Sequence, residues 1–520
     1  MPRDIDQLLA NQKNLEALVA TQRRQLSDKD HQIEHLKLVV AKLQRQQFGR
    51  RAESYPVSPD QLALGLQGKV PSLAPVDDAP ASAPNSARQR PTRQPLPAHL
   101  PRDICVHGVD DAADCPTCGG DLRRIGEDVS EVLDFIPARF RVTRHVRPKL
   151  ACTDCDAVIQ AAAPERPIVR GLPGSGLLAQ VLVSKYCDHL PLYRQRRIYA
   201  REGVDIATST LSDWVKQSSQ LLSPLVDALR RHTLAGTTVH ADDTPVPVLA
   251  PGKGKTKTGR LWTYVRDERP AGSKTPPSVW FAYSPDRQGI RPQKHLARFR
   301  GTIHADGYAG FNRLFDHHRQ EAGCWAHVRR KFYDIQQAQD SPLACQALNY
   351  IQALYQVEDL IRGKPPDERR HVRQARAGPI LDELQHWLQA TLTQVSRKSE
   401  LAKAIRYALG RWQALIRYRD DGELEIDNNA AERALRGVAL GRKNYLFAGS
   451  DRGGEWAAAL YSLIGTAQLN GIDPQAYLTH VLDCIASHPI NRVDELLPWH
   501  VGPVLTSNNT EPAPARRSAA

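Results

Sequence analysis

The sequence predicts a multidomain protein that combines an α/β unit with several α-helical segments. The chain has 520 residues. A single hydrophobic core rarely stabilises a chain of this length, so roughly three or four domain-sized units are expected. Runs rich in β-branched and aromatic residues lie in the middle of the chain, between residues 237 and 305. Helical patterns dominate elsewhere, and strands that alternate with helices are typical of an α/β sheet.

Composition narrows the class of partner. Lys and Arg total 70 against 57 Asp and Glu, a net charge of +13, which favours a polyanion such as nucleic acid. A merely soluble basic protein has the same balance, so charge alone leaves both possibilities open. The chain lacks an apolar run of about 18 residues and an export signal at its start, so we expect a cytoplasmic location.

Residues 1–50 are expected to form a coiled coil. A 4,3 spacing persists from Leu8 to Gln47 without Pro or Gly, and such a repeat forms the seam between paired helices. The alternative is a long solvated helix folded back on its own domain. Self-association into a homo-oligomer is the favoured interpretation, and the apolar seam positions are Leu8, Leu15, Val19, Leu26, Ile33, Leu36, Val40 and Leu43.

Residues 101–165 are predicted to form a zinc-ribbon-like module, after a disordered linker at 51–100 rich in Pro, Ala and Ser. Two Cys-x-x-Cys pairs suit one tetrahedral Zn²⁺ ion better than disulfides in a reducing compartment. The stretch between the pairs alternates well enough for a hairpin. Cys105 and His107 are spare candidates with poorer spacing, and the four proposed ligands are Cys115, Cys118, Cys152 and Cys155.

Residues 166–232 are expected to be helical. Leu192 to Glu202 is a plausible helix and Gly203 a turn, and Ser209 is a possible N-cap for a second helix that carries Leu211 and Trp214. This pattern fits a helix-turn-helix that reads DNA, and a plain helical connector explains it equally well.

A sheet is predicted next, in a core made of residues 233–328 and 421–470. Three adjacent strands and a fourth followed by strand-helix alternation indicate an α/β sheet with an antiparallel edge. Residues 329–420, broken near Gly363 and Pro365, resemble a helical insertion; 471–503 is a C-terminal helical element and 504–520 a disordered tail. The four expected strands are Thr237–Leu249, Leu261–Arg266, Ser278–Tyr283 and the run GTIHA at 301–305.

Three carboxylates are candidates for metal-dependent phosphodiester chemistry. The motif His-Ala-Asp occurs at 240–242 and again at 304–306, which places Asp242 and Asp306 at similar points on two strands. If those strands are neighbours, both carboxylates emerge together, as hard oxygen ligands for two Mg²⁺ ions about 4 Å apart require. Glu432, in DNNAAERALR, is the candidate for the third ligand.

Each carboxylate also has an ordinary structural explanation. Asn429 and Glu432 could form a capping box, and for Glu432 taken alone that explanation is preferred. Asp306-Gly307 suits a turn at a strand end. Basic residues shift the balance towards phosphate contact, and the DNA-binding candidates are Arg329, Arg330, Lys331, Arg433, Arg436, Arg442 and Lys443.

Neighbouring polar residues receive structural interpretations. His240 and His304 share a sheet face with the aspartates and are expected to be hydrogen-bonded core residues more often than metal ligands. Asp243 is turned to the opposite face by strand alternation. Cys324 and His327, in CWAHVRRKF, could bind a metal only with two further ligands that the sequence does not identify, so packing is preferred.

The order of motifs resembles transposases of the insertion-sequence-66 family from about Leu36 to Trp499. No single motif suffices, but their order is specific. The matching stretches are FGRRAES, CPTCGGDL with ACTDC, YCDHLPLYRQ, TLSDWV, HADDTPVPVL, GKTKTGRLWTYVRD, HADGYAGF, CWAHVRRKF, DNNAAERALR, GRKNYLFAGSDRGGE and VDELLPW.

The resemblance implies a ribonuclease-H-like catalytic core in which the first and fourth strands are neighbours. It implies an acidic triad of Asp242, Asp306 and Glu432 that uses Mg²⁺ or Mn²⁺, action on the DNA ends of an insertion sequence, and accessory proteins from the same element. The chain departs from the family pattern at Asp243, where Glu is favoured, and at Gly437, where Pro is common. Two rivals remain: a non-catalytic DNA-binding regulator derived from a transposase, and a nuclease that cuts without joining.

Overall fold

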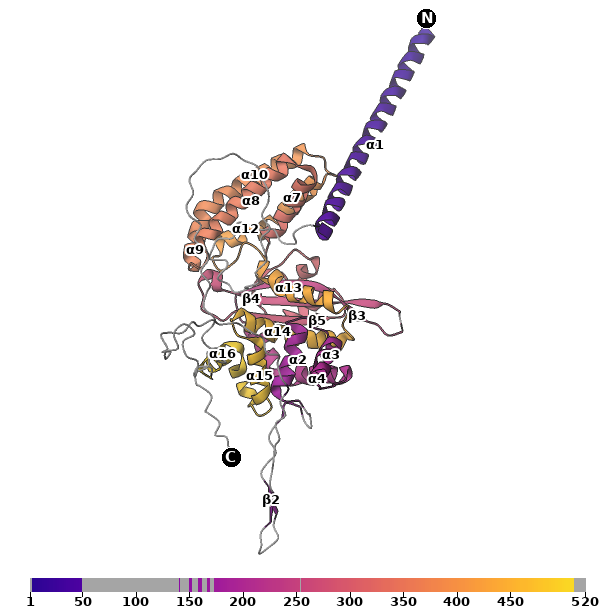
Figure 1. The fold of residues 1–520 in the computed structure, drawn as a ribbon. Coiled ribbons are helices and arrows are strands. Elements are labelled where there is room, and N and C mark those ends of the chain that lie inside the picture. Colours follow the sequence, from indigo (N-terminus) through magenta and orange to yellow (C-terminus); the bar gives the residue numbers. More distant parts are fainter. Residues whose placement is uncertain are drawn as a thin grey trace, which may run out of the picture. The chain divides into compact units, whose positions relative to one another are not determined.

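The computed structural model describes residues 2–48, 140, 149–151, 158–160, 166–168, 173–252 and 254–508. Within its first helix, side chains are described for residues 15–40. The chain divides into two compact units: one is Met1–Gly65 with Arg147–Ala520, and the other is Leu66–Val146. Of the second unit only Phe140 is described, so the fold below is that of the first unit (Figure 1).

A five-stranded mixed sheet forms the centre of this unit, with strand order β5-β4-β3-β6-β7. The first three strands are antiparallel neighbours, whereas β6 pairs parallel to β3 and β7 parallel to β6. This confirms the predicted α/β sheet with an antiparallel edge. The strands are β3 (Thr238–Leu249), β4 (Thr256–Arg266), β5 (Ser278–Ser284), β6 (Gly301–His304) and β7 (Arg319–Ala322).

Alternation along β3 sorts its side chains between two environments. Val239 and Ala241 are buried in a core with Trp262 of β4 and Phe299. The intervening even-numbered residues face the other side, because successive strand side chains point to opposite faces. Asp242 therefore lies on the face opposite this apolar core.

Helices cover the edge and the second face of the sheet. α14 (Asp451–Leu469) runs beside β5 (Figure 1), where Ser462 accepts the backbone N–H of Phe281 at 2.8 Å. Such contacts satisfy donors that an edge strand would otherwise expose. α13 (Asn429–Asn444) lies along β3, and the chain after it bridges to Val248 through Ala448.

The segment before the sheet is helical, as predicted. The expected helix from Leu192 is present as α3, and Gly203 forms the turn with φ of 81°. Ser209 as N-cap was wrong: α4 begins at Thr208 after Ala207, so Ser209 lies inside the helix. The helices here are α2 (Ser175–Tyr186), α3 (Leu192–Arg201), α4 (Thr208–Leu221) and α5 (Ser223–Thr233), and α15 (Pro474–Cys484) and α16 (Pro498–Asn508) lie near the C-terminus.

The helical insertion has a hydrophobic core of its own. Its first helix starts at Trp325, four residues before the predicted boundary, because Trp325 is fully buried in that core. The predicted break is confirmed by Gly363, with φ of 80°, and by a new helix that starts at Pro366. The helices are α7 (Trp325–Gln339), α8 (Pro342–Ile361), α9 (Pro366–Val372), α10 (Gly378–Gln394), α11 (Glu400–Leu409) and α12 (Trp412–Asp420), with a π-helical turn, η4 (Arg373–Ala377), before α10.

α1 (Pro2–Phe48) is one continuous helix. Near its C-terminal end, Leu38 is buried in the core of the insertion and His35 pairs with Glu400 at 2.9 Å. The predicted seam residues Leu15, Leu26 and Leu36 are exposed by 60% or more. Within residues 15–40, the helix therefore contacts the insertion between Asp28 and Leu38 and leaves several apolar side chains exposed. Pairing with a second helix stays a prediction.

Among the helices that the structure describes, none has the length and apolarity needed to cross a bilayer.

Candidate active site

The register between β3 and β6 brings Asp242 and Asp306 to one place. His240 of β3 pairs with His304, the last residue of β6. Each aspartate follows its histidine by two residues, so both lie on the same face just beyond the paired region. The adjacency that the sequence left conditional is thus present.

Asn428 brings the start of α13 to the same point. Its side-chain amide donates to the carbonyl of Ala241 at 2.9 Å, and its Oδ1 lies 3.1 Å from Nδ1 of His240. Because Asn428 is fully buried, these bonds fix the helix start against β3. Glu432 lies in the first turn of α13, and its charge acts on Asp242.

The capping-box explanation for Glu432 is wrong. The residue at the N-cap position of α13 is Asn428, not Asn429. Its side chain bonds to β3 and makes no hydrogen bond to the helix start. Asn429 instead donates to the carboxylate of Asp427 at 2.7 Å. Glu432 is therefore not required to complete the helix start.

Electrostatics show that the three carboxylates share one field. The pKa of Asp242 is raised to about 7, mainly by burial and also by the negative charges of Asp306, Asp243 and Glu432. The backbone N–H of Asp243, which donates to Asp242 at 2.7 Å, opposes this shift. Like charges that act on one another at a partly buried position favour a bound cation, and carboxylate oxygens are the donors that Mg²⁺ prefers.

Asp243 takes no part in this cluster of carboxylates. Its side chain is 1% exposed and accepts from Arg260 at 3.0 Å and from Arg287 at 2.9 Å. The two guanidinium groups compensate its charge. It faces the side of the sheet opposite Asp242, as strand alternation predicts.

The loop after β6 holds Asp306 in place. One carboxylate oxygen accepts the backbone N–H of Tyr308 at 2.9 Å, and Gly307 adopts φ of 89°, so the predicted turn chemistry is also present. From the insertion, Tyr407 donates to the carbonyl of Asp306 and Arg411 to that of Gly307, at 2.9 and 2.8 Å.

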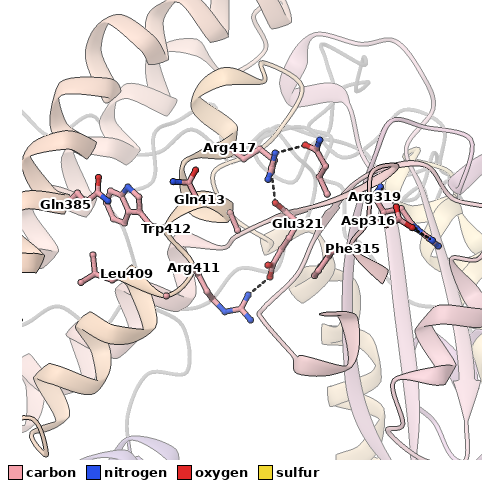
Figure 2. Close-up of a pocket in the computed structure, with 13 residues that line it drawn as sticks. Phe315, Asp316, Arg319, Glu321, Gln385, Leu409, Arg411, Trp412, Gln413 and Arg417 are labelled. Carbon is pink, nitrogen blue, oxygen red and sulfur yellow. Dashed lines mark hydrogen bonds and ion pairs between the residues drawn. The ribbon is translucent and has the colours of Figure 1, made fainter. Parts of the chain in front are cut away.

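Arg411 belongs to an open groove between β7 and the insertion (Figure 2). The same guanidinium is paired with Glu321 of β7 and so links the edge strand to the Asp306 loop. Arg417 lies in this groove as well and donates to Gln320 and to the carbonyl of Glu321. Sequence reasoning missed this contact because Arg411 lies about a hundred residues after the loop that it supports.

His240 and His304 stack on each other as buried neutral rings. Their ring centroids are 4.5 Å apart, and the ring planes are nearly parallel. Burial lowers the pKa of both side chains. His240 is bonded to Asn428, as expected, but the expected hydrogen bond of His304 is wrong, since neither of its ring nitrogens has a partner among the described residues. They pack beneath the carboxylates and support the strands that carry them.

The predicted DNA-binding residues differ in their solvent exposure and in their contacts within the protein. Lys331 lies over the ring of Tyr407 at 4.3 Å, and Arg329 over that of Tyr333 at 5.4 Å. Arg442 donates to the carbonyl of Pro245 at 2.5 Å, so its guanidinium holds α13 against β3. The exposed members of the set are Arg330, Lys331, Arg433, Arg436 and Lys443.

The proposed zinc ligands Cys115, Cys118, Cys152 and Cys155 lie outside the described residues, as do Cys105 and His107. A short antiparallel pair, β1 (Lys149–Ala151) and β2 (Val158–Gln160), flanks the second Cys-x-x-Cys motif. Of the stretch predicted as a hairpin between the two motifs, only residues 140, 149 and 150 are described.

Comparison with known families resolves what kind of protein carries this site. The profile described as the IS66 family of transposases matches residues 170–456, more than half of the chain. The chain belongs to the IS66 transposase family. Three further IS66 profiles match: a zinc-finger binding domain at 113–156, a segment described as a homeodomain of a transposase C at 35–104, and a C-terminal element at 462–499.

Relatives of this IS66 family member extend over almost its full length. The uncharacterized proteins y4hP and y4jD of Sinorhizobium fredii are 40% and 39% identical to it. Each alignment covers 89% of this chain, with 88% of y4hP and 94% of y4jD. The resemblance drawn from the motifs is therefore confirmed as a family assignment.

Proposed function

We propose that this protein is an Asp-Asp-Glu transposase that binds the terminal inverted repeats of its insertion sequence, hydrolyses a phosphodiester and joins the exposed 3′ end to target DNA. One observation carries the proposal: Asp242 and Asp306 follow paired positions of two neighbouring strands, and the charges of Asp306 and Glu432 both act on Asp242, in a chain of the IS66 family. The role of these residues as the catalytic triad is part of the proposal.

The topology supports a ribonuclease-H-like core. Of the strands between residues 238 and 322, the first and the fourth are parallel neighbours, as that fold requires. β6 ends at His304, whereas β3 runs on to Leu249 with β4 as its partner. Prolines at 245 and 247 lie in this part of β3, which has no β6 partner, and proline donates no ladder hydrogen bond.

Divalent ions would be held by the carboxylates of Asp242, Asp306 and Glu432. When bound, Mg²⁺ or Mn²⁺ supplies a Lewis acid for the attacking and leaving oxygens of phosphodiester displacement. The protein contributes orientation: Asn428 fixes Glu432 relative to β3, and Arg411 fixes the Asp306 loop. Exposed Arg and Lys on α7 and α13 would hold the DNA backbone, an interaction that weakens as salt rises.

The remaining segments fit an assembly that handles two DNA ends. We propose that Cys115, Cys118, Cys152 and Cys155 bind one structural Zn²⁺, and that α1 pairs subunits through its exposed apolar seam. α3 and α4 either read the element ends or connect the domains. Accessory proteins of the same element and association with the nucleoid are also part of this proposal.

A joining assay tests the function. Purified protein is incubated with labelled element-end DNA, Mg²⁺ and a target plasmid, and joined product is expected. Binding without cleavage would support the non-catalytic regulator, and cleavage without joining would support the nuclease.

A matched pair of variants tests the site. Asp306→Asn should abolish both cleavage and joining while DNA binding survives. Asp316→Asn, in the loop before β7, should retain activity because Asp316 pairs with Arg319 and lies outside the cluster of carboxylates. Undiminished activity in Asp306→Asn would contradict the assignment.

A further inference from the structure

Two helix starts meet beside Glu432. Cys324 is the N-cap of α7, His327 lies in the first turn of α7, and Glu432 lies in the first turn of α13. Their thiol, imidazole and carboxylate ligand atoms all lie within 4.8 Å of one another. The sequence analysis could not complete a metal site from Cys324 and His327, because Glu432 follows more than a hundred residues later.

The imidazole of His327 is poised for a further ligand. Its Nδ1 atom is buried and has no hydrogen-bond partner among the described residues, and it lies 3.7 Å from Oε1 of Glu432. A buried polar nitrogen without a partner carries a desolvation cost, which a bound cation would offset. The side chains of His327 and Glu432 remain 31% and 39% exposed, so an ion has access from solvent.

The thiol of Cys324 is tied to the same junction. Its sulfur accepts the backbone N–H of Asn428 at 3.2 Å. Burial raises the pKa of Cys324, and the nearby carboxylates of Asp427 and Glu432 raise it further. A coordinating thiol gives up its proton when it binds a metal.

The donor set selects a different class of ion from the carboxylates of Asp242 and Asp306. Mg²⁺ prefers oxygen alone, whereas sulfur with imidazole and one carboxylate suits Zn²⁺ or Co²⁺. Zn–S and Zn–N bonds of about 2.3 and 2.0 Å place tetrahedral ligands roughly 3.5 Å apart. Side-chain rotations that move each ligand atom by about 1 Å would therefore bring the three atoms within bonding distance of one ion.

We infer that Cys324, His327 and Glu432 form a binding site for a thiophilic divalent cation such as Zn²⁺, with the fourth position open to water or to an anionic ligand. Binding releases the thiol proton to solvent and forms one bond from each side chain. This site is separate from the proposed Cys₄ module. It shares Glu432 with the proposed triad, so, if that proposal is correct, occupation by Zn²⁺ removes the third carboxylate and inhibits Mg²⁺-dependent chemistry.

Cobalt titration of the full-length protein that carries one equivalent of Zn²⁺, enough for the proposed Cys₄ module alone, tests the inference. We expect one additional equivalent of Co²⁺ to bind with a thiolate-to-cobalt charge-transfer band. Cys324→Ser should lose that band, and Cys345→Ser, which removes an exposed cysteine of α8, should keep it. His327→Gln and Glu432→Gln should each weaken Co²⁺ binding by at least about tenfold, as expected when a ligand is lost.

The outcomes separate this inference from the proposed function. Absence of a Cys324-dependent band, or a band of unchanged affinity in both His327→Gln and Glu432→Gln, overturns the site, and this holds even if DNA cleavage is observed. A band with the expected dependence supports the site even if the joining assay fails. Since His327 is partly exposed, His327→Gln keeps the test decisive if Cys324→Ser does not fold.

Discussion

The sheet and the helical insertion treat buried charge in opposite ways. In the insertion, Glu358 is almost fully buried and accepts from Arg373 at 2.7 and 2.6 Å, while Arg369 lies 3.6 Å away. Within β3, the charges that act most strongly on Asp242 are those of other carboxylates. In a structural network, buried carboxylates are neutralised by arginines of the same fold. In a cation-binding site, the negative charge is neutralised by the bound ion instead.

The largest effect is expected from breaking the compensated network. Arg373→Ala leaves Glu358 buried without its bidentate partner and should lower the free energy of unfolding by about 3–5 kcal/mol, measured by urea denaturation. Arg376→Ala, an exposed position on the same π-helical turn, is the control and should change little. Equal stability of the two variants would show that the insertion does not depend on this pairing.

A second expected effect concerns the contact between the two regions. Arg411→Ala removes the bond to the Gly307 carbonyl, so the Asp306 loop loses a restraint and strand cleavage should fall by about tenfold to a hundredfold. Arg417→Ala serves as the control, because Arg417 bonds β7 within the same groove without touching that loop. A similar loss of activity in both variants would indicate a general weakening of the groove.

Metal addition should sharpen the contrast. Mg²⁺ at about ten times its dissociation constant should stabilise the wild-type protein by about 1.4 kcal/mol, since only the folded site gathers the carboxylates. For each variant, the rise in melting temperature on adding Mg²⁺ is measured against its own metal-free form. This rise should be smaller in Asp242→Asn than in wild type, and in Asp243→Asn it should equal that of wild type. If Mg²⁺ stabilises wild type and Asp242→Asn equally, the cation binds elsewhere.

The smallest effect is expected from Asp242 in the metal-free protein. Its pKa of about 7 lies above the ordinary value of 3.8, so the folded chain keeps a proton that the unfolded chain has already lost. Stability therefore falls as pH rises between these values, and the penalty is complete above pH 7.

Asp242→Asn removes that penalty and should stabilise the metal-free protein at pH 8 by on the order of 1 kcal/mol. The gain should shrink as pH falls from 7 to 5 in urea titrations. A variant that is less stable than wild type at pH 8 would mean that the carboxylate is compensated within the fold.

Local pattern was enough to predict four of the five strands of this sheet, the helical insertion and the positions of the aspartates. It did not specify β7, and β4 begins at Thr256, five residues before the predicted start. Strand alternation separated Asp242 from Asp243 correctly, and the repeated His-Ala-Asp motif marked two strands that do pair. The capping of α13 was not predictable, because the side chain of Asn428 hydrogen-bonds to β3, nearly two hundred residues earlier in the sequence. The contacts of Arg411 and the third member of the Cys324 cluster were missed for the same reason: tertiary contacts leave no local spacing to recognise.

The base of the insertion is fastened at its two ends. The backbone N–H of Trp325 donates to the carbonyl of Ile426 at 3.2 Å, and Asn428 donates to Cys324 beside it. Because the entry and exit points are already joined, lengthening an exposed turn of the insertion, such as the one at Asp340 between α7 and α8, changes the closure entropy only slowly. Evolution or protein engineering can therefore remodel this appendage, for instance to carry a cargo domain, without relocating Glu432.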